Sequence, residues 1–323
     1  MFDKLSLFTD FQKQITSFTK SLDSHKWIVI MMILLVSYIL FNCCGSSQSP
    51  SSFEGFDNAG TNQKYVFKNN DIYDEFYVNL YDALIEDEEK IKYETSMSED
   101  VTKMNKKSKV LDVGSGTGHH VGMFLKNGID AVGLDKSSEM VKAAKNNYPN
   151  ADFSVGNASD SFLFNRDQFS HITCFYFTLY YMKDKKHFFE NCRNWLKPEG
   201  YLIFHLVNKH KFDPIPNSGD PMTLVNPQNY VNKRITNSVI VYNDFTYKSN
   251  FKLNEKSNKA EFEEVFKFKK NGNYRHNVHT LYMEKQDEIL KMAKDVGFKY
   301  IDRYDLVDIG YEYQYLYVFK KTE

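Results

Sequence analysis

The chain has 323 residues, of which 42% are hydrophobic and 26% charged, and its formal net charge is −1. A chain of this length can bury one large core, and its near-neutral charge argues against a polyanionic partner such as nucleic acid. The four cysteines have neither metal-ligand nor disulfide spacing, so we expect a reduced compartment and no resident metal ion.

The N-terminal segment, residues 1–26, has an amphipathic pattern. Its apolar residues recur at steps of three and four, as they do on one face of a helix, and lysines occupy some of the polar positions. The apolar positions are Phe2, Leu5, Phe8, Phe11, Ile15, Phe18 and Leu22. This pattern predicts a helix that lies in a membrane interface or pairs with another helix.

Residues 27–44 are predicted to form a transmembrane anchor. The run at 27–41 reads WIVIMMILLVSYILF and contains neither a charge nor a proline. With Asn42, Cys43 and Cys44 it reaches the lower limit of about 17 residues for a bilayer span. A cleaved secretory signal peptide is the alternative, although a long segment precedes the run and no A-x-A-like cleavage site follows it. Cys43 and Cys44 are either palmitoylation sites or plain apolar residues.

Residues 45–68 are predicted to be a flexible linker. The segment is rich in Ser, Gly and Asn and has too few apolar residues to bury a core. The anchor therefore localises a separate domain, which we place at residues 69–323.

A glycine-rich turn follows a predicted strand at residues 109–120, which read KVLDVGSGTGHH. Glycines at such a strand-to-helix turn let the backbone approach a ligand closely, and the following helix offers free N–H groups to it. The dinucleotide fingerprint G-x-G-x-x-G does not fit, because its third glycine would fall on His119 or Val121. A phosphate-binding P-loop does not fit either, because no Gly-Lys-Ser/Thr follows.

The turn resembles the D-x-G-x-G-x-G motif of class I S-adenosylmethionine (SAM)-dependent methyltransferases at every defining position. Further segments match the family in order: an acidic strand end at Asp135, a loop at 156–158 and the turn Leu-Lys-Pro-Glu-Gly at 196–200. The resemblance covers residues 70–320. Within the family, the chain is similar to the small-molecule type, which includes sugar-amine and glycine N-methyltransferases. It implies SAM as the cofactor.

The resemblance also assigns a set of cofactor-binding residues. Asp135 would accept hydrogen bonds from the ribose hydroxyls. Asn157 departs from the Asp usual in the family but keeps a carbonyl acceptor for the adenine amine. The full set is Asp112, Gly114, Ser115, Gly116, Gly118, Asp135, Asn157, Ala158 and Phe175.

The expected fold is a doubly wound, Rossmann-like α/β domain with a seven-stranded sheet that ends in an antiparallel hairpin. Strands alternate with helices up to residue 207, which is typical of a parallel sheet. Residues 208–284 are predicted to form an inserted antiparallel lid sheet over the acceptor pocket. Its expected strands are 238–249, 260–269 and 274–283, and a helix at 285–296 and strands at 299–306 and 311–320 follow.

An aromatic helix precedes the first strand, and the family has a similar helix that closes over the cofactor. Tyr77, Tyr81 or Tyr93 could close the site here or simply pack. For a general base, His205 and Tyr180 are the candidates, together with His279. For each of them a purely structural role is the favoured interpretation.

We therefore expect a membrane-anchored enzyme that moves a methyl group from SAM to an N or O atom of a small acceptor, such as a lipid head group, a sugar or an amine. The alternative is a catalytically silent SAM-fold domain that acts as a membrane-tethered interaction module. The charge bias around the span places the N-terminus in the cytosol. SAM is made in the cytosol, however, and a glycosylation sequon at 157–159 lies in the cofactor loop, so we expect a single-pass protein with a cytosol-facing domain.

Overall fold

The computed structural model describes residues 63–216 and 227–322. The predicted amphipathic segment, the anchor at 27–44 and the linker up to residue 62 lie outside these residues. In the part of the chain that is described, no helix combines the length and the apolar character that a membrane span needs.

The helices and strands follow one another in the order that the sequence predicts for the core. They are β1 (Lys64–Lys68), η1 (Asn69–Ile72), α3 (Glu75–Ile85), α4 (Glu88–Thr102), β2 (Lys109–Val113), α5 (His119–Lys126), β3 (Asp130–Asp135), α6 (Ser138–Asn147), β4 (Asp152–Val155), β5 (Phe169–Cys174), α7 (Thr178–Tyr181), α8 (Lys185–Trp195), β6 (Leu196–Val207), η3 (Pro227–Tyr230), β7 (Asn237–Val241), β8 (Phe245–Asn254), β9 (Lys259–Phe268), β10 (Tyr274–Tyr282), α9 (Gln286–Asp295), β11 (Phe298–Asp305), η4 (Val307–Ile309) and β12 (Gln314–Lys321).

The core is a seven-stranded sheet in the order β11-β12-β6-β5-β2-β3-β4, which confirms the predicted doubly wound fold. Strands β4, β3, β2, β5 and β6 are parallel, and β12 runs antiparallel to both β6 and β11. The strand order therefore reverses between β2 and β5. In sheets of this kind a ligand binds at that reversal, outside the carboxyl ends of the strands.

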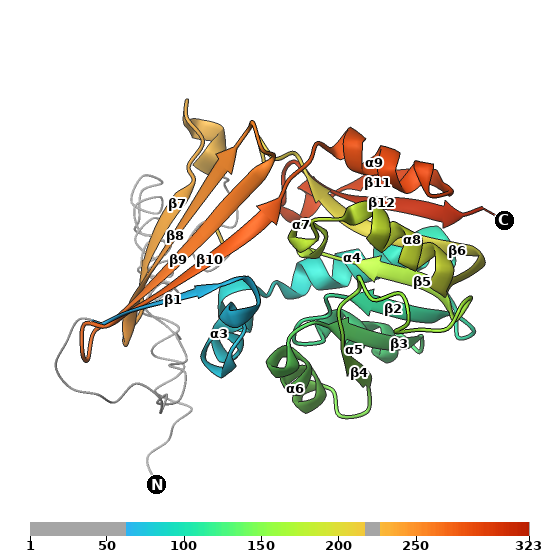
Figure 1. Cartoon of the computed structure of the whole chain (residues 1–323), viewed down its shortest axis with the longest axis horizontal. Coiled ribbons are helices and arrows are strands. Elements are labelled where there is room, and N and C mark those ends of the chain that lie inside the picture. The colour runs from blue at the N-terminus through green and yellow to red at the C-terminus, as the bar shows by residue number, and fades with distance from the viewer. Residues whose placement is uncertain (1–62, 217–226, 323) are drawn as a thin grey trace, which may run out of the picture. The chain divides into compact units, whose positions relative to one another are not determined.

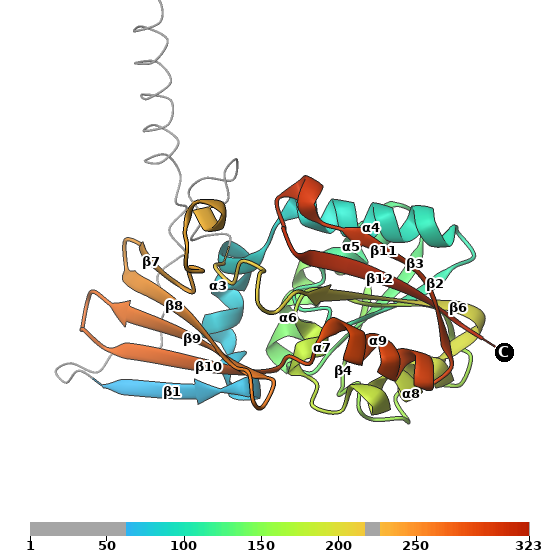
Figure 2. The same cartoon turned by 90° about the horizontal axis from the view of Figure 1, so that it is seen from above.

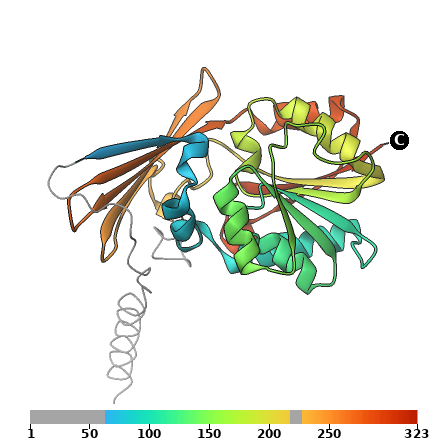
Figure 3. The same ribbon diagram turned by 60° about the horizontal axis from the view of Figure 1, so that its bottom comes forward.

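Helices cover both faces of this sheet. Figures 2 and 3 show α4 and α5 on one face and α8 and α9 on the other. Helices α6 and α8 each begin at a polar side chain that satisfies a free N–H group. The Ser137 hydroxyl accepts from Met140 N before α6, and the Asp184 carboxylate accepts from His187 N before α8. These caps fix where α6 and α8 begin.

A second sheet of five strands has the order β1-β10-β9-β8-β7 (Figure 1). It contains the predicted lid strands, with two corrections. Residues 64–68, which we expected in the linker, form β1 and pair in parallel with β10. The single strand expected at 238–249 is a hairpin of β7 and β8, which turns at Asn243 and Asp244.

Helix α3 packs on this second sheet through aromatic side chains. The ring of Phe76 lies 5.6 Å from that of Phe266, and both Tyr77 and Phe266 are buried. The buried guanidinium of Arg275, on β10, binds Asp74 at 2.6 Å and the carbonyl of Ile72 at 2.7 Å. The entry segment and the lid sheet are therefore one packed unit.

Candidate active site

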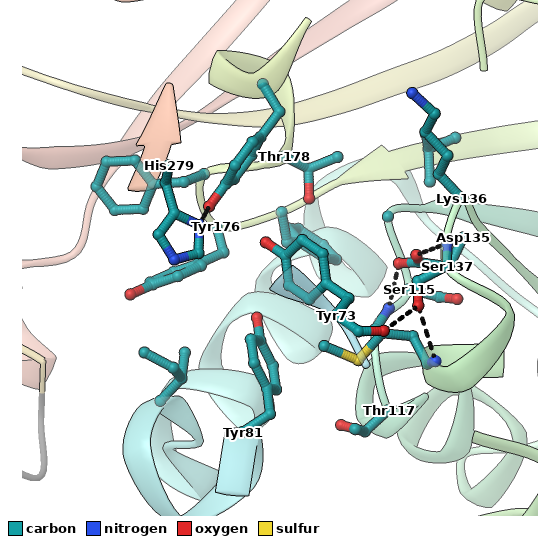
Figure 4. Close-up of a pocket in the computed structure, with 18 of the residues that line it drawn as sticks. Tyr73, Tyr81, Ser115, Thr117, Asp135, Lys136, Ser137, Tyr176, Thr178 and His279 are labelled. Carbon is teal, nitrogen blue, oxygen red and sulfur yellow. Dashed lines mark hydrogen bonds between the residues drawn. The ribbon is translucent and has the colours of Figure 1, made fainter. Parts of the chain in front are cut away.

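A cavity of about 720 Å³ lies where the core sheet reverses its strand order. Such a volume falls within the roughly 300–1,000 Å³ of small-ligand sites. One part of its wall is the glycine turn and the end of β3. The other part is aromatic and comes from α3, α7 and β10 (Figure 4). The sequence predicts the first part almost completely and the second only in outline.

The glycine turn lies against the cavity through its backbone. Gly114 has a φ of +73°, and an added Cβ would lie 2.3 Å from the side chain of Thr178. Gly116 has a φ of +54° and faces open space, with the nearest atom, on Tyr81, at 3.9 Å. Gly118 does not line the cavity; an added Cβ there would meet Phe153, so this glycine serves packing.

Asp135 ends β3 and holds the glycine turn in place. Its carboxylate accepts a hydrogen bond from Gly116 N and another from Ser137 N, both at 2.9 Å (Figure 4). Burial raises the pKa of Asp135, and these backbone hydrogen bonds offset part of the rise. Each carboxylate oxygen keeps a lone pair for a ligand donor, such as a ribose hydroxyl.

Asp112, at the carboxyl end of β2, is buried below the turn. Its carboxylate accepts a hydrogen bond from the Thr173 hydroxyl at 2.7 Å. Burial raises its pKa to about 6, against the opposing effects of His120 and of the Thr173 hydrogen bond. A buried carboxylate that lines a cavity is a natural partner for a ligand ammonium group.

Lys90, on α4, is a lining residue that the sequence analysis missed. Its ammonium lies over the rings of Tyr176 and Tyr311, at 4.7 and 4.2 Å from their centroids. Its side chain is 6% exposed, and Nζ has no hydrogen-bond partner among the described residues. The nearest carboxylate, of Glu94, is 4.0 Å away and is itself bonded to His120 at 2.8 Å. A buried cation of this kind calls for an anionic ligand group.

The remaining predicted cofactor residues line the cavity as well. Ser115 belongs to the glycine turn, and Asn157 and Ala158 follow β4. Phe175 follows β5 and stacks on His120 with ring centroids 4.4 Å apart. Of the nine predicted cofactor-binding residues, Gly118 is therefore the exception.

Three titratable side chains meet at the edge of the cavity. The ligand atoms of Asp82, Glu86 and His119 all lie within 4.8 Å of one another, a spacing that a metal ion could bridge. Burial lowers the pKa of His119, but the hydrogen bond to Asp82 and the charge of Glu86 raise it more. The contacts of His119 Nε2 with the carboxylates of Asp82 and Glu86, at 3.1 and 3.4 Å, account for the group without a metal.

Tyr180 and His205, the first two candidates for the general base, do not line the cavity. Tyr180 is fully buried, and its hydroxyl accepts from Val207 N at 2.9 Å. His205 is fully buried too, with its nitrogens 2.7 Å from Tyr176 O and 3.0 Å from Gln314 Oε1. Burial lowers the pKa of His205 to about 4. Both are structural, because alternation along β6 and the turn of α7 direct them into the core.

The third candidate for the general base, His279, does line the cavity, as do two of the three entry tyrosines. Tyr77 and Tyr81, on α3, belong to the wall. Tyr93 lies outside it, with its hydroxyl 3.4 Å from Asp305 O. Residues that line the cavity without having been predicted include Tyr73, Tyr176 and Tyr181.

Residues 110–200 match the family model described as a methyltransferase domain. This chain carries a SAM-dependent methyltransferase domain. The match begins in β2 and covers the glycine turn, Asp135 and the 156–158 loop, which carry the resemblance seen in the sequence. Recognition of the family, and of SAM as its cofactor, is thus confirmed.

Protein 235L of Invertebrate iridescent virus 6, named a methyltransferase by inference, is 33% identical to this chain over 91 residues. That stretch is 27% of this chain and 33% of the viral protein, so the chain matches about a third of the length of this relative.

Solved structures share the fold over more of the chain. A SAM-dependent methyltransferase from Clostridium acetobutylicum has a TM-score of 0.60 at 18% identity, covering 77% of this chain and 98% of that one. The sugar N-methyltransferase KedS8 from Streptoalloteichus has a TM-score of 0.56 at 18% identity, covering 83% and 100%. The amino pentose methyltransferase CalS10 from Micromonospora echinaspora, solved with SAM bound, has a TM-score of 0.52 at 16% identity, covering 72% and 91%. At these identities the likeness establishes the fold.

Proposed function

We propose that this chain transfers a methyl group from SAM to a nitrogen or oxygen atom of a small acceptor, while residues 27–44 hold it at a membrane. The observation that carries the proposal is the two-part cavity. Its glycine turn and Asp135 suit a nucleoside, and its aromatic part leaves room for a second, smaller molecule. The alternative, a silent interaction module, gives no reason for a cavity with both parts intact.

The residues present fit the cofactor at three points. Asp135 would accept from the ribose hydroxyls. Lys90 would bind the carboxylate of the methionine moiety. That carboxylate would supply the hydrogen-bond partner that Lys90 Nζ lacks among the described residues. Asp112, buried at the end of β2, would lie opposite the ammonium of the same moiety. The two charges of the amino acid part would thus meet two opposite charges on the protein.

When bound, SAM supplies an electrophilic methyl group on a sulfonium. The chain's contribution is to align the acceptor with that methyl group and to exclude water. Tyr73, Tyr81 and Tyr176 are suited to this, because all three line the cavity, and Figure 4 shows Tyr73 between the glycine turn and His279. Desolvation by burial raises the pKa of each of these hydroxyls, so all three stay neutral hydrogen-bonding groups.

An amino sugar is the first acceptor to test. KedS8 and CalS10 share the fold and are named for a sugar and an amino pentose. Lipid head-group amines come second, because a membrane anchor would bring the domain to them. Transfer of labelled methyl from SAM to such acceptors tests the activity. A protein that binds SAM but methylates none of these acceptors would redirect the search to hydroxyl compounds.

Membrane attachment rests on the apolar run at 27–44 and has its own test. The full chain should stay in the membrane pellet after carbonate extraction, and a variant lacking 27–44 should not. Two further measurements test whether the domain faces the cytosol. Protease added to sealed microsomes should degrade a cytosol-facing domain, and Asn157 of such a domain should carry no glycan. Release of the full chain by carbonate would contradict the anchor.

A further inference from the structure

Three side chains from three separate elements form a hydrogen-bonded chain at the aromatic end of the cavity. The hydroxyl of Tyr181, on α7, lies 2.8 Å from His279 Nδ1, on β10. The other ring nitrogen, Nε2, lies 2.8 Å from Glu264 Oε2, on β9. His279 is 2% exposed and Glu264 is fully buried. Tyr181 and His279 line the cavity, whereas Glu264 lies behind them.

Glu264 is held as a carboxylate by donors on all sides. Tyr247 O–H donates to its Oε1 at 2.8 Å, and Asn277 Nδ2 donates to Oε2 at 3.2 Å. Burial opposes ionisation, but the hydrogen bonds from His279 and Tyr247 outweigh it and lower the pKa of Glu264. When the ring of His279 takes up a proton, this carboxylate, 2.8 Å from Nε2, is placed to balance the charge.

The ionised carboxylate fixes the direction of the hydrogen bonds. A carboxylate only accepts, so the neutral ring of His279 must carry its proton on Nε2. Nδ1 then accepts the proton of the Tyr181 hydroxyl. The Tyr181 oxygen is left with lone pairs for another donor, and Tyr73 already makes a hydrogen bond to it. This is the arrangement of a base that is oriented by a third group.

We infer that Tyr181, His279 and Glu264 form a proton relay that takes up the proton lost by the methyl acceptor. The inference rests on the proposed function and narrows it, because the acceptor atom must carry both a lone pair and a hydrogen, as in a primary or secondary amine or a hydroxyl. Tyr181 touches the acceptor and is the catalytic residue. His279 and Glu264 act through it.

The acceptor lone pair forms a bond to the methyl carbon, the bond from that carbon to sulfur breaks, and its electron pair stays on sulfur. The N–H or O–H bond of the acceptor breaks and its proton moves to the Tyr181 oxygen. The Tyr181 proton moves to His279 Nδ1, and Glu264 balances the imidazolium that results. After product release the proton returns through Tyr181 to water in the open cavity.

Nitrogen-15 NMR of the full chain, labelled in its histidines, tests the resting state without any acceptor. We expect the ring of His279 to carry its proton on Nε2, with Nδ1 showing the shift of an accepting nitrogen. Glu264→Gln should change that signal, and Tyr181→Phe should remove the shift caused by the hydroxyl. A proton on Nδ1 would overturn the relay.

Kinetic measurements with an amino sugar and labelled SAM test whether the relay takes part in catalysis. Tyr181→Phe and His279→Gln should lower kcat roughly 100-fold or more, leave KM for SAM unchanged and flatten the acidic limb of the kcat–pH profile. Tyr180→Phe is the matched control, because the neighbouring hydroxyl bonds only the Val207 backbone. An unchanged kcat in folded Tyr181→Phe refutes the relay. Failure of the folded wild type to bind SAM would refute the proposed function instead.

Discussion

The ammonium of Lys90 lies 4.7 Å from the ring centroid of Tyr176 and has no hydrogen-bond partner among the described residues. If it binds the carboxylate of SAM, Lys90→Met should weaken SAM binding by about 1.5–3 kcal/mol, roughly 10- to 150-fold in Kd. Titration calorimetry measures this directly. Lys92→Met is the matched control, since that side chain lies on the same helix and pairs with Glu88 and Glu89 at the surface.

A second ligand sharpens that test. Decarboxylated SAM lacks the group that Lys90 would bind. The wild type should prefer SAM over it, and Lys90→Met should lose most of this preference. If the wild type and Lys90→Met prefer SAM over decarboxylated SAM to the same degree, a residue other than Lys90 binds the SAM carboxylate.

Asp112 should make stability depend on pH in an unusual direction. Its folded-state pKa of about 6 lies above the usual Asp value of roughly 3.9, so folding takes up a proton between these values. Stability present below pH 4 is lost as the pH rises through 6, by about 3 kcal/mol in total. Asp112→Asn should lack this loss. Urea unfolding of both ligand-free proteins at pH 4.5 and 7 measures this loss. If the free energy of unfolding changes equally with pH in the wild type and in Asp112→Asn, Asp112 is not the group responsible.

The two glycines of the turn should respond differently to alanine. At Gly114 the new Cβ would lie 2.3 Å from the Thr178 side chain at a φ of +73°, so strain of about 1–2 kcal/mol adds to a clash. At Gly116 only the backbone strain applies, because the nearest atom is 3.9 Å away. Gly114→Ala should therefore lower Tm clearly more than Gly116→Ala. Equal losses would mean that the turn is not packed as described.

Lys185 joins the lid sheet to the core. Its buried ammonium binds Glu284 at 2.7 Å and the carbonyls of Tyr282 and Met182 at 2.8 and 2.9 Å. Lys185→Met should cost about 3 kcal/mol, because it leaves a partly buried carboxylate and two carbonyls unpaired. Denaturant unfolding checks this against exposed Lys186→Met. A smaller cost in the Glu284→Gln background would identify the ion pair as the cause.

The cofactor half of the site was predictable because it is local in sequence. The glycine turn follows a buried strand, and Asp112 and Asp135 lie at the carboxyl ends of two such strands. The carboxyl ends of parallel strands meet at one edge of the sheet, so these residues come together at the cavity. Gly118 was the exception, since spacing alone cannot say whether a glycine serves a ligand or the neighbouring Phe153.

The acceptor half depends on contacts that no local pattern contains. Glu264 and His279 come together only through the antiparallel register of β9 and β10, in which Glu264 pairs with Asn277. Strand β1 was hidden for the same reason, because five residues of a polar segment become a strand only beside β10. The turn between β7 and β8 was visible as Asn243-Asp244 within an apolar run, and that signal should have divided the strand.

The most direct measurement is titration calorimetry of SAM, and of its demethylated product, into the wild-type protein and Asp135→Ala. Both ligands should bind the wild type with micromolar Kd. Asp135→Ala should lose at least about tenfold in affinity, because the variant lacks the acceptor for the ribose hydroxyls. Absence of binding to a folded wild type would contradict the methyltransferase account and favour a membrane-tethered interaction module.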